Sequence, residues 1–262
     1  MPGKPTLFAA AVVAAIYAAG APAGAVEIDK SAEYRACMAL VKTQPKEAFE
    51  TALAFRSMGG GMAAEHCAAA ALIELGLYTD AAQRLETLAQ ARLAEPKIKA
   101  RLYHHAGQAW LLAGKPEMAT QAISAAIGLL PGVADFHVDR AQAWAARKDY
   151  AAAEGDLSVA LNLSPSRADV YALRASARRF LDRNDDAIAD ARMALELEPN
   201  NPEALLERGI LRRLAGDDAG ARADWMKILN GMPDSTAAEA ARKNIELMDV
   251  KPEGDAAAPP RR

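Results

Sequence analysis

Small and apolar positions recur along most of this chain at intervals of 34 residues. One set of these recurring positions always holds alanine, a second holds glycine or alanine, and a third holds proline. The sets are Ala119, Ala153, Ala187 and Ala221; Gly107, Ala141, Ala175 and Gly209; and Pro131, Pro165, Pro199 and Pro233. Proline ends helices and biases the preceding residue away from helical angles. Each period is therefore expected to hold a helix, a turn, a second helix and a proline loop.

The segments between these sets carry turn-forming residues. They are AGKP at 113–116, RKD at 147–149, DRND at 182–185 and AGDD at 215–218. Such clusters of glycine, proline and aspartate punctuate helices. The small residues on either side of each turn allow two antiparallel helices to approach closely. Because the chain is 52% hydrophobic but only 5% aromatic, with alanine making up much of the difference, the pattern predicts an all-α fold.

These segments resemble tetratricopeptide (TPR) repeats, which have 34 residues with small side chains at positions 8, 20 and 27 and proline at 32. The resemblance implies an all-α, right-handed α-solenoid over residues 26–249. Its repeats would be a degenerate first unit at 29–61, then 62–99, 100–133, 134–167, 168–201 and 202–235, with a capping helix at 236–249. The repeat at 62–99 is four residues longer than the others. We expect its second helix to lengthen between Ala81 and Pro96 to take up this excess.

The two ends of the chain differ from the repeats. Lys4 precedes an uninterrupted apolar run, Leu7 to Ala19, and Ala23 and Ala25 form a small-residue cleavage pattern. This pattern predicts a secretory signal peptide at 1–25, cut after Ala25, and hence a periplasmic or secreted protein. The alternative is a membrane anchor, although the run is shorter than the roughly 20 residues that span a bilayer. Residues 250–262 have no apolar pattern and are expected to be disordered.

Charge and motifs exclude several classes of function. The formal net charge is −3 and the pI about 5.9, without the basic excess typical of nucleic-acid binders. The sequence has no nucleophile-elbow motif, phosphate-binding glycine loop or zinc-protease motif. We therefore expect a protein that is not an enzyme, carries no cofactor and binds neither nucleic acid nor, after signal cleavage, membranes.

The sequence has two cysteines, Cys37 and Cys67. By the TPR resemblance they fall at positions 9 and 6 of neighbouring first helices, which lie close together in such proteins. The resemblance and the predicted export together imply a disulfide between them. Two buried free thiols are the alternative.

Three repeats depart from the TPR pattern in a coordinated way. Position 7, usually leucine in the family, is arginine in the last three repeats, and position 23 is aspartate in the same repeats. The residues are Arg140, Arg174 and Arg208, with Asp156, Asp190 and Asp224. The two earlier repeats lack both members. Because they occur and vanish together, we predict three structural Arg–Asp salt bridges between paired helices.

The resemblance also implies a concave groove lined by the first helix of each repeat, which TPR proteins use to bind partners. The candidate partner-binding residues are His104, Gln108, Gln142, Ser176, Arg179, Phe180, Leu206, Ile210, Arg213 and Leu214. Apolar residues beside Arg179 and Arg213 suit a peptide or helix with apolar anchors and an acidic group. Alternatively, these arginines only complement the negative ends of helix dipoles.

Three functions remain open at this level. The leading hypothesis is a periplasmic scaffold that binds a protein partner of unknown identity, possible settings being envelope assembly or secretion. A second is a structural homo-oligomer that packs through apolar groove edges. A third is a small molecule or metal binder that uses His66 and His104, which both occupy repeat position 5. Because a metal site needs three or four converging ligands, we predict no metal site.

Overall fold

The computed structural model describes residues 31–92 and 95–249. The predicted signal peptide (1–25) and the predicted disordered tail (250–262) lie outside these residues. The described parts contain helices and no strand. The helices are α2 (Ala32–Leu40), α3 (Pro45–Ser57), α4 (Gly61–Glu74), α5 (Tyr78–Gln90), α6 (Pro96–Leu112), α7 (Pro116–Leu129), α8 (Ala134–Ala146), α9 (Tyr150–Leu163), α10 (Ala168–Phe180), α11 (Asn184–Leu197), α12 (Pro202–Leu214), α13 (Asp218–Gly231) and α14 (Thr236–Asp249).

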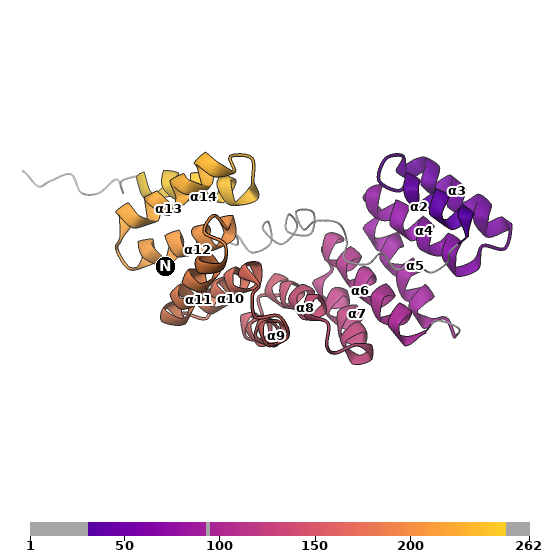
Figure 1. Cartoon of the computed structure of the whole chain (residues 1–262), viewed down its shortest axis with the longest axis horizontal. Coiled ribbons are helices and arrows are strands. Elements are labelled where there is room, and N and C mark those ends of the chain that lie inside the picture. Colours follow the sequence, from indigo (N-terminus) through magenta and orange to yellow (C-terminus); the bar gives the residue numbers. More distant parts are fainter. Residues whose placement is uncertain (1–30, 93–94, 250–262) are drawn as a thin grey trace, which may run out of the picture. The chain divides into compact units, whose positions relative to one another are not determined.

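The chain divides into two compact units, one up to Pro165 and one from Ser166. In the first unit α2 to α9 form four helical hairpins, and each helix packs against the next (Figure 1). In the second unit α10 to α13 form two hairpins, and α14 packs on both α12 and α13 (Figure 1). The predicted succession of helix, turn, helix and loop is therefore confirmed, and α14 covers the last hairpin as the expected capping helix. Within the described ranges, no helix is both long and apolar enough to traverse a bilayer.

In each of the last four hairpins, one backbone position in the turn has a left-handed conformation. It recurs every 34 residues, as Gly114, Lys148, Asp182 and Gly216, with φ of 68°, 63°, 59° and 84°. Glycine adopts this conformation without strain, whereas lysine and aspartate do so at a cost. The turn geometry is thus kept even where the sequence does not supply glycine.

The repeated small residues lie where paired helices approach most closely. Ala119, Ala153, Ala187 and Ala221 are all fully buried. A Cβ atom placed on Gly209 would lie 2.3 Å from Nε1 of Trp225, and one placed on Gly107 would lie 2.3 Å from Cγ1 of Ile123. Glycine at these two positions therefore makes room for the large side chains on the partner helix.

The extra residues of the repeat at 62–99 do not lengthen its second helix, so that expectation is wrong. Helix α5 has 13 residues and ends at Gln90, whereas α6 has 17 and begins at Pro96. Proline at the first helical position has no amide hydrogen to leave unpaired and has a preset helical φ, so Pro96 favours an early start for α6. The excess is taken up by the connection after Gln90 and by the first turn of α6.

Candidate functional site

The three predicted Arg–Asp pairs form between the helices of their hairpins. Each arginine binds both oxygens of its aspartate through Nε and Nη2, at distances of 2.6 to 2.9 Å. The aspartate side chains are buried, with 5 to 7% exposed. Two parallel hydrogen bonds of this kind fix the orientation of the guanidinium relative to the carboxylate. The pairs therefore fix the register of the two helices in each hairpin.

Each of these aspartates also binds a second residue that the sequence pattern did not reveal. Asp190 accepts a bond from Arg178 and Asp224 one from Arg212, both at 2.8 Å. These arginines lie four residues, or one helical turn, after the predicted ones. Asp156 instead contacts Nδ1 of His137 at 3.2 Å. Helical spacing from the predicted arginine could have identified the additional arginines.

The first unit contains one interhelical pair of reversed charge. Glu65 on α4 binds Arg84 on α5 at 2.6 Å, and Arg84 occupies repeat position 23, where the last three repeats carry aspartate. Arg56 on α3 also binds Glu65, at 3.0 Å. Here the acid is on the first helix of the hairpin and the base on the second, opposite to the Arg–Asp pairs.

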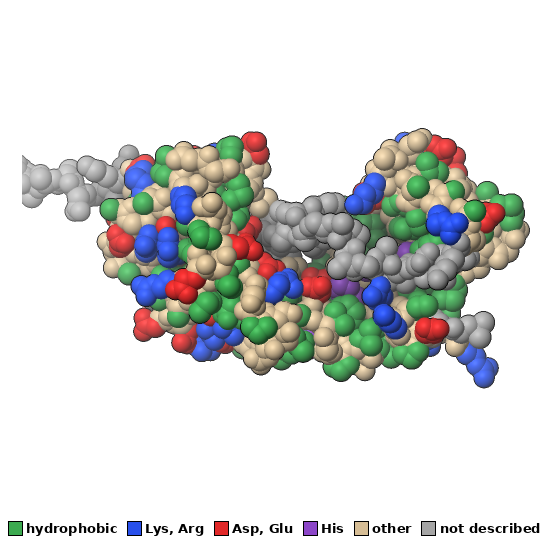
Figure 2. Space-filling model, viewed as in Figure 1, with side chains coloured by type: hydrophobic (Ala, Val, Ile, Leu, Met, Phe, Trp, Pro, Cys, Tyr) green, Lys and Arg blue, Asp and Glu red, His purple; other side chains and the backbone are tan. Residues whose placement is uncertain are grey.

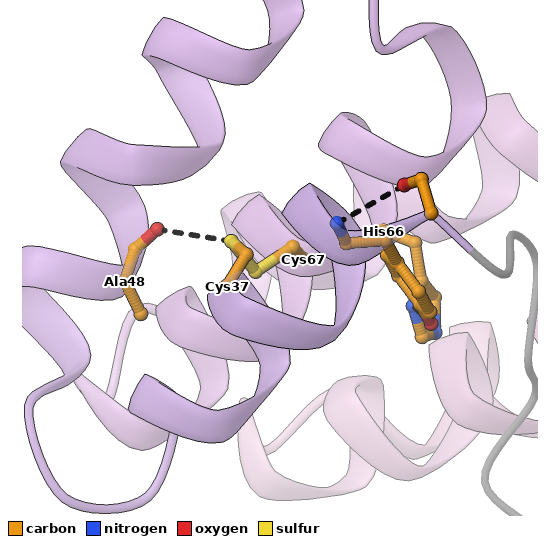
Figure 3. Close-up of a disulfide and its surroundings, with 6 residues drawn as sticks. Cys37, Ala48, His66 and Cys67 are labelled. Atoms are coloured by element: carbon orange, nitrogen blue, oxygen red, sulfur yellow. Dashed lines mark hydrogen bonds between the residues drawn. A yellow bond between two sulfur atoms is a disulfide. The ribbon is translucent and has the colours of Figure 1, made fainter.

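A disulfide joins Cys37 on α2 to Cys67 on α4, as the sequence predicts (Figure 3). Both residues are fully buried, and Sγ of Cys37 lies 3.4 Å from the carbonyl oxygen of Ala48 on α3. One turn before Cys37, the hydroxyl of Tyr34 lies 2.9 Å from Nδ1 of His66, the residue next to Cys67. Two neighbouring links, one covalent and one polar, therefore hold α2 on α4.

A row of rings crosses the first helices of the hairpins in the first unit. Tyr34, His66, His105, His104 and Phe136 follow one another, with ring centroids 4.5 to 6.4 Å apart. Burial lowers the pKa of His66 to about 4. Burial first, and then the charges of His104, His66 and Arg101, lower the pKa of His105 to about 3. Both of these imidazoles are therefore neutral at neutral pH.

His104 and Gln108, two predicted groove residues, share one carboxylate. Nε2 of His104 lies 2.6 Å from Oδ2 of Asp139 on α8, and Nε2 of Gln108 donates to the same oxygen at 2.7 Å. Gln142 is buried, and its Oε1 accepts no hydrogen bond from the described residues. Among those residues, no three histidine, cysteine, aspartate or glutamate side chains are grouped so as to hold a metal ion. His66 and His104 thus take part in internal contacts with tyrosine, aspartate and other rings.

Lowering the pH should destabilise the protein in part through His66. Its pKa in the folded state, about 4, is below its usual value of 6.5. As pH falls through 6.5, His66 binds a proton in the unfolded chain but not in the folded one. The contribution of His66 therefore lowers the stability until about pH 4, below which it stays constant. In His66→Asn the side-chain oxygen can still accept a hydrogen bond from Tyr34. Between pH 7 and pH 4 we expect the free energy of unfolding of this variant to fall by about 3 kcal/mol less than that of wild type. Urea unfolding at both pH values measures this difference, and equal losses in the two proteins would contradict it.

In the second unit, the first helices α10, α12 and α14 form one surface, which we call the α10–α12–α14 face. Arg179 on α10 binds both oxygens of Glu207 on α12, at 2.6 and 3.1 Å, and its guanidinium lies 4.4 Å from the ring centroid of Phe180. Ser176 and Leu206 are buried. Arg179 is therefore neutralised within the unit instead of presenting a free charge to a ligand.

Arg213 has a different environment. Its guanidinium donates to the carbonyl oxygens of Asn244 and Leu247, at 3.4 and 3.3 Å, near the end of α14. The last four carbonyls of a helix lack intrahelical partners, and that of Leu247 is among them in α14, so a cation stabilises this end of the helix. Leu214, the residue after Arg213, is 63% exposed, and Leu247 is 50% exposed. Ile210, one turn before Leu214 on the same side of α12, is half-buried.

Charged side chains elsewhere on the second unit are mixed in sign. Figure 2 shows lysine, arginine, aspartate and glutamate interspersed over α10 to α14 on the face in view. No single block of one charge dominates that view. Selectivity for a partner on this unit would therefore depend on local apolar and charged groups and not on a broad electrostatic field.

The tandem hairpins with a 34-residue period define an α-solenoid, and comparison with solved structures identifies it as the TPR fold. MamA from Desulfovibrio magneticus RS-1 matches 73% of this chain and 96% of its own, with a TM-score of 0.55 and 17% identity. YrrB, described as a TPR protein with an unusual peptide-binding site, matches 72% of this chain and 96% of its own, with a TM-score of 0.54 and 15% identity. No protein-family model and no curated protein matches the chain. The predicted resemblance is confirmed at the level of the fold.

Proposed function

We propose that this protein is a non-catalytic scaffold that binds a segment of a protein partner on the α10–α12–α14 face. The observation that carries the proposal is that Leu214, the residue after Arg213, and Leu247, whose carbonyl oxygen Arg213 contacts, are both exposed. Large exposed apolar side chains close to a charged group are typical of interaction sites. Such a surface suits an amphipathic segment that inserts apolar anchors between α12 and α14.

The charges on this face favour a partner with an acidic side chain near those anchors. Arg179 is already paired with Glu207, whereas Arg213 contacts only carbonyl oxygens among its hydrogen-bond partners in the described part of the chain. A guanidinium has five N–H donors, and a carboxylate binds it more strongly than a carbonyl does. Arg213 is thus the better of the two predicted arginines for an acidic group on the partner.

The location that we propose is the periplasm or another extracytoplasmic compartment. The N-terminal sequence has the features of a signal peptide, and the only two cysteines of the chain are joined in a disulfide. Disulfides persist in oxidising compartments, so the two observations support the same location.

Site-specific photo-crosslinking in the native cell tests this function. A photoreactive phenylalanine at position 210 should crosslink to a second protein, and Arg213→Glu or Leu247→Asp should reduce the crosslinked product at least tenfold. Met193→Asp on α11 is the matched control, because Met193 is 40% exposed but lies outside the α10–α12–α14 face. It should leave the product unchanged.

Two results would overturn the proposal. One is a crosslinked product that survives both Arg213→Glu and Leu247→Asp, in proteins whose circular dichroism shows that they are folded. The other is a product made of two copies of this chain, together with a dimer in light scattering. That second result would favour the homo-oligomer instead.

A further inference from the structure

A second candidate site lies in the first unit, where the first helices α6 and α8 carry adjacent polar side chains. Its centre is Asp139 on α8, whose side chain is 15% exposed. Oδ2 of this carboxylate already has two partners, Nε2 of His104 and Nε2 of Gln108. Oδ1 has no hydrogen-bond partner in the described part of the chain, and it is not one of the fully buried polar atoms there that lack a partner. One oxygen of this carboxylate is therefore accessible from outside.

Gln142 on α8 adds a second acceptor without a donor. It lies three residues after Asp139, a spacing that places both side chains on the same side of the helix. Gln142 is only 6% exposed, and its Oε1 accepts no hydrogen bond from the residues that the structure describes. Leaving a buried acceptor without a donor is unfavourable. Because the last torsion of a glutamine side chain rotates easily, a donor that reaches Asp139 can also satisfy this oxygen.

The groups that hold Asp139 leave it little freedom to move. The ring centroid of His104 lies 4.5 Å from that of Phe136 and 5.9 Å from that of His105. His104 is buried, and Gln108 is half-buried. A side chain that is already fixed loses little conformational entropy when a ligand binds to it. The carboxylate is thus preorganised to accept a hydrogen bond at Oδ1.

The charges around Asp139 favour a cation. Of the two groups bound to Oδ2, one is an uncharged amide and the other is an imidazole, which is charged only if it is protonated. One helical turn earlier, Arg101 on α6 and Asp135 on α8 bring one charge of each sign. Arg140, the residue after Asp139, is bound to Asp156. These two pairs of opposite charges balance, so the carboxylate of Asp139 remains as a negative charge without a fixed cation.

The number of free acceptors favours lysine over arginine. A guanidinium binds a carboxylate best through two parallel hydrogen bonds, one to each oxygen. Asp139 offers only one oxygen for this purpose, because Oδ2 already accepts from His104 and Gln108. An ammonium group has three donors that point in different directions, so it can bind Oδ1 of Asp139 and Oε1 of Gln142 together.

We propose that this site binds a lysine side chain of a protein partner. The ammonium would donate to Asp139 and Gln142, whereas His104 and Gln108 hold the carboxylate in place. The flexible four-carbon stem of lysine lets its charge reach between two helices while the main chain of the partner stays at the surface. The site lies in the first unit and uses no residue of the α10–α12–α14 face. It is therefore independent of the function proposed above, and it requires a basic residue where that face favours an acidic one.

Selection of peptides on the full chain tests this site. A phage-displayed library of random 12-residue peptides would first be depleted on Asp139→Asn and then selected on wild type. In this variant the side-chain oxygen can still accept from His104 and Gln108, and an NH₂ donor replaces the free oxygen. The enriched peptides should share a lysine. One of them, synthesised with a fluorophore, then serves as the probe in fluorescence polarisation.

Substitutions in the probe and in the protein should weaken binding by different amounts. Norleucine keeps the methylene chain of the shared lysine but has no ammonium, and it should weaken binding at least tenfold. Arginine at the same position should weaken it at least threefold. In the protein, Asp139→Asn should weaken binding at least tenfold and Gln142→Leu at least threefold. The norleucine peptide leaves the protein unchanged, so the test stays valid if Asp139→Asn fails to fold.

The matched control is Asp135→Asn, which removes the same charge from α8 one helical turn away and should change binding less than twofold. Leu247→Asp should bind the probe as wild type does, and Asp139→Asn should leave the crosslink at position 210 unchanged. These two results separate the site from the function proposed above.

Several results would overturn the proposal. One is the absence of enriched peptides after depletion, and another is enriched peptides without a shared lysine. Equal binding of the norleucine or arginine peptide would contradict recognition of a lysine ammonium. An effect of Asp135→Asn as large as that of Asp139→Asn would show a general electrostatic attraction in place of a site.

Discussion

Asp190→Ala should destabilise the second unit by about 3 to 5 kcal/mol, one of the largest effects of any single polar substitution in this chain. The carboxylate accepts three bonds of 2.8 to 2.9 Å from Arg174 and Arg178. Asp190 is 5% exposed at its side chain, and each arginine is 16% exposed. Its removal leaves two mostly buried guanidiniums beside each other without the carboxylate between them. Urea denaturation followed by circular dichroism measures the loss.

Two variants show whether the loss comes from unpaired charge. Asp169→Ala removes an exposed carboxylate that pairs with Arg167, and it should change stability by less than about 1 kcal/mol. A triple variant with Arg174→Met, Arg178→Met and Asp190→Leu replaces the charges with apolar side chains and should recover most of the stability. If the triple variant were as unstable as Asp190→Ala, the pairs would contribute net stability of their own, and desolvation of unpaired charge would not explain the loss.

Removal of the Cys37–Cys67 disulfide should cost about 3 to 4 kcal/mol of stability in the first unit. The bond closes a loop with a sequence separation of 30 residues, and the open chain regains the conformational entropy of that loop on unfolding. The expected result is that Cys37→Ala with Cys67→Ala unfolds at lower urea concentration, with α2 and α3 losing amide protection from hydrogen exchange first. Helix α2 has only nine residues, so few other contacts hold it.

Reduction of the wild-type protein provides the matched control for this prediction. The chain has no other cysteine, so dithiothreitol can act on the protein only at this bond. The reduced protein and the double alanine variant should unfold at similar urea concentrations, and both should leave the unfolding of the second unit unchanged. Equal stability with and without reductant would show that packing alone holds α2 on α4.

The periodic features of the sequence predicted the fold and its internal pairs. Prolines and small residues recur at fixed intervals because every hairpin meets the same steric demands. The structural role of Ala153 or Pro165 can therefore be inferred from the residues at the same position in other repeats. Arg140 and Asp156 could be paired because both are absent where either is absent. The cysteines could be paired because the repeats place them on neighbouring first helices.

Apart from Arg178 and Arg212, which recur one turn after the predicted arginines, the features that the sequence did not predict occur once. The ring row depends on His105 and Phe136, which occupy no shared repeat position with the residues they contact. Glu207 neutralises Arg179 from the next hairpin, a contact that no spacing within one repeat reveals. The extra residues could have lengthened α5 at its end or α6 at its start, and the periodic pattern does not distinguish these two possibilities.

The reversed pair Glu65–Arg84 has a consequence for how the chain folds. Similar repeats can mispair during folding, when the first helix of one hairpin docks on the second helix of another, and such errors are characteristic of repeat proteins. Docking α4 on α11 would place Glu65 near Asp190, and docking α10 on α5 would place Arg174 near Arg84. Like charges then oppose each other where the native hairpins have opposite ones. The change of polarity between the α4–α5 hairpin and the last three hairpins therefore marks which helices belong together before their apolar surfaces, which are mostly alanine, could distinguish them.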